Sequence, residues 1–459
     1  MARESWASRL GFILAAAGSA VGLGNIWRFP YVAGEGGGAA WIIVYLILVL
    51  IIGYPMMVTE VSLGRAAQKN VWGTFKELAP NTPWWLVGAL GVLTSIVILS
   101  YYSVIGGWSL AYIFHSAFSS VGPGTEFDVF FIEHITDVWV PIIWHAVFML
   151  ICVGIIAGGV VKGIQRWVQI LWPVMGVLLI VIVIRGVTLP GAAEGLSWYL
   201  VPDFGDLTAG AFTAAVGQVF FTLSLAMGII ITYGSYFNKQ DEVPGSAGYV
   251  VGLDTAVAII AGFAIFPAVF AMGFDPGEGA GLAFITLPAI FAEIPWGGAF
   301  FGTLFFILLS AAAVTSAISL LEVSASWLID EFNFKRSSAA ILMGVIIFLI
   351  GLPSTLGYSL LEGVTIEAIA PELLDVFDWI AYHIFLPIGG LLTAIFAGHV
   401  WGAKKAQEEA NTGVKAGKFK IGDWYVPILK YLLPIVIFII LVLGFIETFA
   451  PEILPWEVI

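Results

Sequence analysis

Residues 18–30 read GSAVGLGNIWRFP and interrupt the first of many apolar segments in this chain. Three glycines within seven residues, followed by asparagine, arginine and proline, make a poor continuous helix. Unpaired backbone groups are costly in lipid, so an unwound stretch is tolerated only where it lines a cavity inside the protein. A kinked helix with glycines for close packing is the alternative. The stretch indicates a broken membrane helix whose free backbone groups can meet a ligand.

The composition is that of an integral membrane protein. Of the 459 residues, 60% are hydrophobic and 11% are charged, and the mean hydropathy is +1.00. Soluble domains carry about 25% charged residues. The single cysteine, Cys152, excludes an internal disulfide and a thiolate zinc site. The formal net charge of −13 gives no support to electrostatic binding of nucleic acid.

Apolar windows predict an all-α polytopic chain that forms a single domain over residues 1–459. The lengths of spans three and eight suggest tilt or extension beyond the bilayer. Segments 119–138 and 402–423 read as an acidic solvated loop and a polar linker rich in lysine and glutamate. The eleven predicted spans are 9–32, 39–64, 84–118, 139–158, 166–187, 209–237, 245–272, 297–330, 337–352, 376–400 and 425–448.

The basic residues orient these spans. With the N-terminus in the cytoplasm, all of the 18 lysines and arginines except Arg28 and Arg185 fall on the cytoplasmic side. By the positive-inside rule, this distribution predicts a cytoplasmic N-terminus. An odd number of spans then places the C-terminus outside.

Span six carries a second interruption. Residues 218–228 read QVFFTLSLAMG, with glutamine, threonine and serine in the middle of an apolar segment. Hydroxyls that bond back onto their own helix are the alternative explanation. The interruptions fall in the corresponding members of two sets of five spans, which is the pattern of an inverted repeat with its binding site at the broken midpoints. We therefore expect repeats at 9–187 and 209–400, with an additional helix at 425–448.

Polar groups inside the spans indicate the chemistry of the site. Arg28, Glu60 and Asp254 lie in apolar spans, where a charge is usually functional, although each could be a paired structural ion. The hydroxyls of Thr315 and Ser316 lie in span eight. Oxygen ligands of these kinds suit a hard cation such as Na⁺. The residues thus indicate a cation-coupled transporter of a small solute.

Other functional classes fit the sequence less well. A channel would need a continuous polar stripe, whereas the polar residues cluster at the two breaks and at span eight. A hydrolase would need a base beside a nucleophile, and no histidine or lysine falls in spans one, six or eight. We expect that the protein is not an enzyme. A non-transporting sensor and a proton-coupled carrier of the same architecture remain open.

The segments resemble the neurotransmitter:sodium symporter family, in its bacterial and archaeal amino-acid branch. The resemblance covers nearly the whole chain and implies a sodium-coupled symporter in a prokaryotic plasma membrane that works by alternating access. Its motifs are RLG at 9–11, AVGLGNIWRFP at 20–30, GQVFFTLSLAMG at 217–228, ITY at 231–233 and FITLP at 284–288.

The resemblance implies two Na⁺ sites and no organic cofactor. The first would use Ala20, Asn25, Thr222 and Asp254 with the substrate carboxylate. The second would use carbonyls of Gly18, Val21 and Ala312 with the hydroxyls of Thr315 and Ser316. The implied substrate-binding residues are Ala20, Leu23, Gly24, Ile98, Tyr102, Phe221, Thr222, Ser224, Met227, Ser316 and Leu320. The implied gates are Arg28 with Asp378 on the outside, and Arg3 with Asp330, braced by Trp6 and Tyr236, on the inside.

Several positions bear on substrate and coupling. Gly22 stands where relatives that carry biogenic amines have an aspartate, so we expect a neutral, hydrophobic L-amino acid that brings its own carboxylate. Asp254 stands where many members have asparagine, and Ala258 where chloride-dependent relatives have a hydroxyl. We therefore predict chloride-independent transport, either with proton antiport through Asp254 or without proton movement. Gly163 and Pro173 show the spacing that this family uses where span five unwinds.

Overall fold

The structure is a computed structural model that describes residues 4–118, 121–122, 124–207, 209–273, 283–293, 297–366 and 369–450. Within these ranges every regular element is a helix, apart from one isolated bridge between Ile366 and Ala370. The all-α prediction is confirmed.

Nine helical segments among the described residues are long and apolar enough to cross a membrane. A tenth span is a pair of helices, Arg9–Ala20 and Gly24–Glu35, bent by 50° at the break that the sequence predicted. The predicted sixth span is interrupted as expected, between Ala209–Thr222 (α11) and Ile229–Ser235 (α12). The nine segments are Ala39–Ala67, Trp85–Ala117, Val140–Ala157, Val160–Val187, Val243–Ala271, Gly298–Phe332, Arg336–Leu356, Leu373–Val400 and Tyr425–Phe449.

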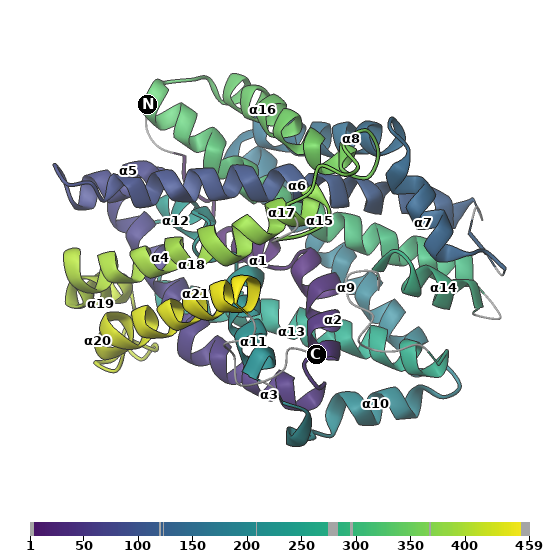
Figure 1. Cartoon of the computed structure of the whole chain (residues 1–459). Coiled ribbons are helices and arrows are strands. Elements are labelled where there is room, and N and C mark those ends of the chain that lie inside the picture. The colour runs from purple at the N-terminus through teal and green to yellow at the C-terminus, as the bar shows by residue number, and fades with distance from the viewer. Residues whose placement is uncertain are drawn as a thin grey trace.

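Figure 1 shows how the helices are arranged, and several of the spans contain π-helical turns. The spanning elements are α1 (Arg9–Ala20), η1 (Gly24–Arg28), α2 (Phe29–Glu35), α3 (Ala39–Leu48), η2 (Val49–Gly53), α4 (Tyr54–Ala67), α6 (Trp85–Ala117), α8 (Val140–Ala157), η3 (Val160–Gln165), α9 (Arg166–Val187), α11, α12, α13 (Val243–Ala271), α15 (Gly298–Phe332), α16 (Arg336–Leu356), α17 (Leu373–Trp379), η6 (Ile380–Phe385), α18 (Leu386–Ile395), η7 (Phe396–Val400), α20 (Tyr425–Pro427), η8 (Ile428–Leu432) and α21 (Leu433–Phe449). The connecting helices are α5 (Val71–Leu78), α7 (Phe127–Thr136), α10 (Ala192–Leu200), η4 (Phe204–Asp206), α14 (Thr286–Glu293) and α19 (Ala403–Asn411).

The predicted boundaries were wrong in a few places. The ninth span does not end at 352, because α16 continues through Pro353 to Leu356. A proline in the last turn of a helix removes only one hydrogen bond, so the helix can continue past it. The fifth span begins at Val160, with a π-helical turn that the prediction omitted. The segments 119–138 and 402–423 were read as a loop and a linker, yet they contain α7 and α19.

The break in the first span follows from its local sequence. Ser8 caps α1, since its Oγ accepts a hydrogen bond from the Gly11 amide at 3.0 Å. The helix ends at Ala20 because Val21 is extended, with φ −73° and ψ 100°. The chain becomes helical again at Gly24, and Pro30 lies in the first turn of α2, where a proline is tolerated.

The break in the sixth span is a left-handed stretch held by a buried carboxylate. Ser224, Ala226 and Gly228 have φ of +54°, +66° and +80°. Such values are uncommon for residues other than glycine. The Ala226 amide donates to Glu60 Oε1 at 2.7 Å, and Glu60 lies on α4 with no exposed surface. Glu60, which the sequence marked as a buried charge, thus stabilises the second break.

The two breaks lie at the centre of the helix packing. Helix α1 packs against α9, α13 and α15, while α12 packs against α4 and α15. The long helices α6 and α15 pack along each other. This arrangement surrounds both breaks with protein, which is the condition for an irregular backbone at membrane depth.

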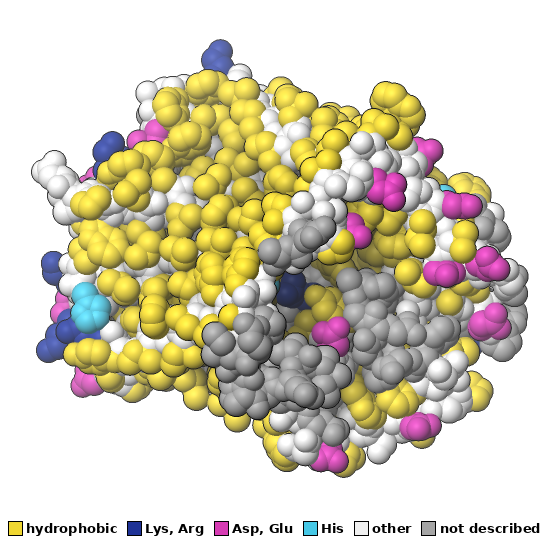
Figure 2. Space-filling view, in the orientation of Figure 1, with side chains coloured by type: hydrophobic (Ala, Val, Ile, Leu, Met, Phe, Trp, Pro, Cys, Tyr) yellow, Lys and Arg dark blue, Asp and Glu magenta, His cyan; other side chains and the backbone are white. Residues whose placement is uncertain are grey.

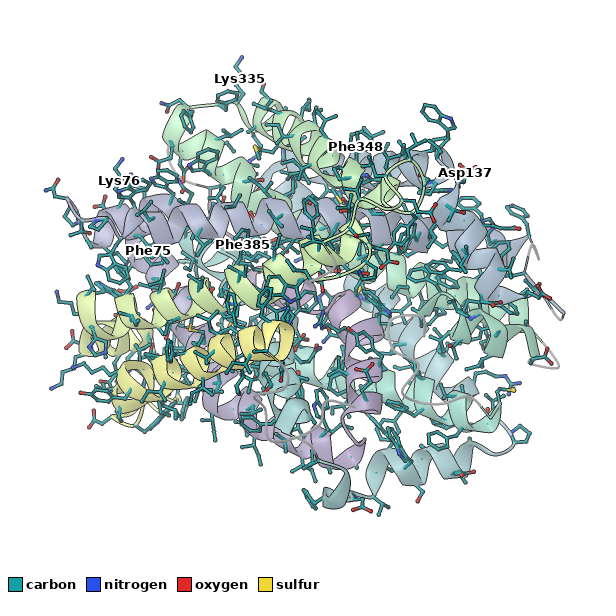
Figure 3. All side chains as sticks on the ribbon, viewed as in Figure 1. Phe75, Lys76, Asp137, Lys335, Phe348 and Phe385 are labelled. Atoms are coloured by element: carbon teal, nitrogen blue, oxygen red, sulfur yellow. The ribbon has the colours of Figure 1, made fainter. Side chains whose placement is uncertain are left out.

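Basic residues gather at one end of the molecule, and the opposite end is mostly acidic. Figure 2 shows Lys and Arg together with some Asp and Glu at one end, mostly Asp and Glu at the other, and a broad hydrophobic band between them. Figure 3 places Lys76 at the first end and Asp137 at the second. We call them the basic end and the acidic end. Their assignment to the cytoplasm and the exterior remains a prediction.

Candidate functional site

A small cavity lies between the two breaks. Its walls come from the end of α1 and from η1, α6, α12, α15 and the stretch between α11 and α12. The lining residues are Ser19, Ala20, Gly22, Gly24, Ile98, Tyr102, Phe221, Ser224, Met227, Ile229, Ser316 and Leu320. Of the predicted substrate residues, all line this cavity except Leu23 and Thr222.

Three lining residues were missing from the predicted set of substrate residues, although the sequence had singled out one of them, Gly22, as a position that bears on substrate class. Ser19 belongs to the interrupted stretch at 18–30, and its hydroxyl in an apolar segment is a signal that could have identified it. Ile229 is the first residue of α12, and an isoleucine in an apolar span carries no such signal.

The cavity floor is made by groups that approach each other closely. The Leu23 amide donates to Tyr102 Oη at 3.1 Å, so Leu23 faces the site through its backbone. A Cβ on Gly22 would collide with Ser316 Oγ and lie 2.9 Å from Tyr102 Oη. An aspartate at position 22 therefore does not fit, and the cavity contains no carboxylate that could pair with an ammonium group at this point.

Oxygen atoms cluster beside the cavity around Asp254. Asn25 Nδ2 donates to Asp254 Oδ1 at 2.7 Å, and Thr222 Oγ1 lies 3.1 and 3.2 Å from the two carboxylate oxygens. All three side chains are buried. The structure thus brings together three members of the predicted first sodium site. Asn25 meets Asp254 through its amide nitrogen, while its Oδ1 accepts a hydrogen bond from the Gly22 amide at 3.0 Å.

A second oxygen cluster joins α1 to α15. Thr315 Oγ1 donates to the Ala312 carbonyl at 2.9 Å and lies 3.4 Å from the Val21 carbonyl. Ser316 Oγ donates instead to the Ser19 carbonyl at 2.8 Å. Three members of the predicted second sodium site, Val21, Ala312 and Thr315, meet here. The role of the Gly18 carbonyl stays a prediction.

On its acidic-end side the cavity is covered by an arginine and aromatic rings. Arg28 Nη1 lies 3.7 Å from Asp378 Oδ2. Its guanidinium lies 5.1 Å from the centre of the Phe221 ring, which lines the cavity, and 4.2 Å from that of Tyr382. The predicted pair of Arg28 and Asp378 over Phe221 is therefore assembled.

At the basic end, Trp6 closes the bundle. Its Nε1 donates to the Tyr233 carbonyl at 3.0 Å, and its ring packs edge-on against Tyr236. The predicted pair of Arg3 and Asp330 is not observed, since Arg3 lies outside the described residues. Asp330 accepts hydrogen bonds from the amide and side chain of Asn70.

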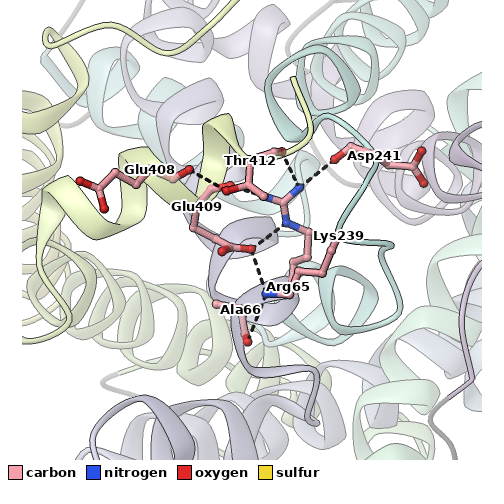
Figure 4. Close-up of polar contacts among 7 residues, drawn as sticks. All are labelled: Arg65, Ala66, Lys239, Asp241, Glu408, Glu409 and Thr412. Carbon is pink, nitrogen blue, oxygen red and sulfur yellow. Dashed lines mark hydrogen bonds and ion pairs between the residues drawn. The ribbon is translucent and has the colours of Figure 1, made fainter. Parts of the chain in front are cut away.

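An arginine on α4 forms a polar centre that the sequence did not reveal (Figure 4). Arg65 is fully buried, and its Nε donates to Glu409 Oε1 on α19 at 2.8 Å. Its Nη1 reaches the carbonyls of Asp241 and Thr412 at 2.8 and 3.2 Å, and Nη2 donates to the Glu409 carbonyl. A cation at the end of α19 also complements the helix dipole.

Comparison with known proteins decides the family. A family profile described as "Sodium:neurotransmitter symporter family" matches residues 3–138 and 129–456. The chain belongs to this family of sodium-dependent membrane transporters. A Bacillus subtilis relative, the uncharacterized sodium-dependent transporter YhdH, is 38% identical over 441 residues, which cover 95% of this chain and 96% of the relative. A Methanocaldococcus jannaschii sodium-dependent transporter is 33% identical and is covered over 89% of its length.

A solved member of the family has the same fold. The crystal structure of MhsT in complex with L-phenylalanine matches with a TM-score of 0.88 at 47% sequence identity. The match covers 96% of this chain and 99% of that one. These matches confirm the family and the broken-helix fold that the motifs predicted.

Proposed function

We propose that the protein is a sodium-coupled symporter of neutral, hydrophobic L-amino acids that works by alternating access. The observation that carries this proposal is the cavity between the two breaks. Its side walls are mostly apolar, and backbone groups freed at the breaks are available for an amino-acid headgroup. The phenylalanine bound by MhsT supports the same class of substrate. Apolar pockets discriminate weakly between side chains of neighbouring size, so we expect several hydrophobic amino acids to be accepted.

The two oxygen clusters are the proposed sodium sites. The first would hold Na⁺ with Asn25, Thr222 and Asp254, close to where the substrate carboxylate would lie. The second would use Thr315 with the carbonyls of Val21 and Ala312. Carboxylate, hydroxyl and carbonyl oxygens are ligands that hard cations prefer. A Hill slope near one for Na⁺ in both binding and uptake would contradict two coupled ions.

Transport is proposed to be independent of chloride. Asp254 places a negative charge within the first cluster, and the buried residue Ala258 lacks the hydroxyl that would help to hold an anion. Tyr45, Gln218 and Thr222, which correspond to the other elements of the chloride site in chloride-dependent relatives, are present and buried. The Asp254 carboxylate already supplies the negative charge that balances Na⁺. It would therefore repel a chloride ion bound beside it.

The test is uptake of labelled L-phenylalanine into proteoliposomes under an inward Na⁺ gradient or an equal K⁺ gradient, with chloride or gluconate as the anion. We expect accumulation with Na⁺ that persists in gluconate. Accumulation that requires chloride would overturn the chloride proposal and keep the symporter. Binding without flux would indicate a sensor, and accumulation driven by a proton gradient alone would indicate a proton-coupled carrier.

A paired variant tests the role of Asp254. Asp254→Asn removes the charge but keeps the shape of the side chain, so we expect the Na⁺ concentration for half-maximal uptake to rise at least tenfold. Thr255→Val, at the next residue, is the matched control and is expected to stay within twofold of the wild type. Equal values for both variants would show that Na⁺ binding does not depend on the charge of Asp254.

The basic end is proposed to face the cytoplasm of a prokaryotic cell, with the N-terminus inside and the C-terminus outside. The separation of charge in Figure 2 supports this orientation through the positive-inside rule. A cysteine introduced at the exposed residue Lys76 should react with a membrane-impermeant maleimide only after the cells are opened.

A further inference from the structure

The connection between the last two spans carries a local excess of positive charge. The whole chain has a formal net charge of −13, yet residues 412–421 contain three lysines and no aspartate or glutamate. Two further lysines lie on α19, the helix just before this stretch. All five are exposed, and none of them forms an ion pair with the residues that the structure describes. The five are Lys404, Lys405, Lys415, Lys418 and Lys420.

We call residues 412–421 the lysine loop, and its two ends are joined. Asn411 Nδ2 donates to the Ile421 carbonyl at 2.9 Å, and the Ile421 amide donates to Asn411 Oδ1 at 2.8 Å. Ile421 is buried. Gly413 and Gly417 have φ of +80° and +78°, which allows the chain to turn sharply inside the loop. The lysines are therefore presented by a folded loop with a fixed base.

The base of the lysine loop is bonded to α4 (Figure 4). Arg65 Nη1 on α4 donates to the Thr412 carbonyl at 3.2 Å, and Arg65 Nε donates to Glu409 Oε1 at 2.8 Å. A Cβ on Gly413 would lie 2.8 Å from the Gln240 carbonyl, so the loop also packs closely against the turn before α13. The contacts that hold the loop in place use none of its lysine side chains, which are left for a partner outside the protein.

The lysine loop lies beside the hydrophobic band. The last span begins at Tyr425, shortly after the loop ends, and Figure 2 shows basic side chains that border the hydrophobic surface at this end. Phe419, which two of the lysines flank, is 59% exposed. Trp424 and Tyr431 continue this exposed aromatic surface onto the first turns of the span. Aromatic rings that alternate with lysines are typical of the interface between lipid and water.

We propose that the lysine loop binds the headgroups of anionic phospholipids in the adjacent leaflet. The lysine ammonium groups pair with the lipid phosphates, and Phe419 inserts at the boundary between headgroups and acyl chains. Clusters of lysines next to a membrane helix attract anionic lipids. A soluble polyanion would satisfy the lysines, but it would leave the phenylalanine in water. The inference goes beyond the proposed transport function and does not depend on which leaflet the basic end faces.

Quenching of a fluorophore by spin-labelled lipids tests this surface. The full-length protein with Cys152→Ala and Ala416→Cys carries a bimane label at an exposed position of the lysine loop. It is placed in phosphatidylcholine nanodiscs with increasing fractions of spin-labelled phosphatidylglycerol or spin-labelled phosphatidylcholine. A lysine near the surface favours anionic lipid by about fivefold. We therefore expect half-maximal quenching at a fraction of phosphatidylglycerol at least about fivefold lower than that of phosphatidylcholine.

Two triple variants assign this preference. Changing Lys415, Lys418 and Lys420 to Gln should make the two lipids quench equally. The matched control changes three exposed lysines elsewhere at the basic end to Gln and should keep the preference. The control lysines are Lys69, Lys76 and Lys335.

A further variant tests the aromatic contact, because Phe419→Gln should weaken quenching by both lipids and keep the preference. The proposal is overturned if both lipids quench the unmodified loop equally, or if both triple variants lose the preference alike. Loss of the preference in millimolar inorganic phosphate at constant ionic strength would show that the loop binds a soluble anion instead, and would also overturn it. The measurement uses no amino acid and no Na⁺ gradient, so a failure of the proposed transport function would leave its outcome unchanged.

Discussion

On the side of the cavity that faces the acidic end, Arg28 and Asp378 are 3.7 Å apart, and the arginine lies against the rings of Phe221 and Tyr382. At the basic end, Arg336 and Glu322 are 2.7 Å apart, and the carboxylate is fully buried. A cavity of about 690 Å³ adjoins Arg28 between α2, α11, α18 and α21. At the basic end, Trp6 is instead 2% exposed.

The difference shows that the two closures depend on different interactions. The acidic end is covered by a loose ion pair and by rings, whose contacts can slide with little loss of energy. The basic end is held by hydrogen bonds between charged groups, which are about twice as strong as neutral ones and need exact geometry. Opening the basic end therefore breaks contacts of more precise geometry than opening the acidic end does. In this structure the basic end is closed.

The largest effect on stability is expected from Arg65. In Arg65→Met, the carboxylate of Glu409 and the carbonyls of Asp241, Thr412 and Glu409 lose their buried partner. Breaking a buried, hydrogen-bonded charge interaction costs about 3 kcal/mol or more. Because the unfolding entropy of a chain this long is about 1 kcal/mol per kelvin, thermal unfolding of the purified protein in detergent should show a midpoint lower by about 3 °C or more.

Lys239→Met is the matched control for Arg65. Lys239 Nζ lies 3.3 Å from the same Glu409 oxygen, but its side chain is 46% exposed. An exposed pair of this kind contributes about 0–1 kcal/mol, so the midpoint should stay within about 1 °C. An equal fall of the unfolding midpoint in both variants would show that stability depends on the net charge around Glu409. It would not then depend on the buried hydrogen bonds of Arg65.

The acidic end is expected to respond to pH through His134 on α7. The side chain is 7% exposed, and burial, together with neighbouring His115, lowers the pKa of His134 to about 4. An unfolded histidine titrates near 6.5. The unfolded form therefore binds more protons between these values, and the stability present above pH 6.5 is lost as the pH falls towards 4.

Hydrogen exchange of α7 measures this loss. Between pH 8 and pH 5, opening of α7 should become easier by about 2 kcal/mol after correction for the intrinsic exchange rate. His134→Gln should remove the pH dependence, while exchange in the first turns of α16, which begins with Arg336, should change little. A pH dependence that survives in His134→Gln would assign it to other groups of the acidic end.

The fold could be predicted because its signals are local. Gly22, Gly24 and Pro30 mark the first break within one short stretch, and Thr222 and Ser224 mark the second within an apolar run. Each signal needs only the rule that polar or helix-breaking residues in a span must face protein. Asp254 and Thr315 stood out as polar side chains in apolar spans, and the family resemblance implied their sodium roles. The structure brings both close to the breaks.

What the sequence did not reveal depends on distant pairs. Arg65 and Glu409 are 344 residues apart, and Glu4 and Val160 are 156 apart. Nothing in the local pattern of either partner identifies the other. The buried charge at Glu322 lies near the end of a long span, where it reads as an ordinary interfacial residue. Such contacts become visible only when the helices are placed in space.

The smallest effects are expected where the acidic end closes. Asp378→Asn removes one partner of a 3.7 Å pair that is partly exposed, so binding of labelled L-phenylalanine in saturating Na⁺ should weaken by no more than about threefold. Arg28→Lys keeps the charge but loses the planar contact with the two rings. Because cation–π contacts of arginine contribute about 0.5–1 kcal/mol at partly exposed sites, we expect a loss of about two- to fivefold. If Asp378→Asn instead weakened binding more than tenfold while Arg28→Lys did not, the ion pair would be the closure at this end. The two ends would then be held by the same kind of interaction.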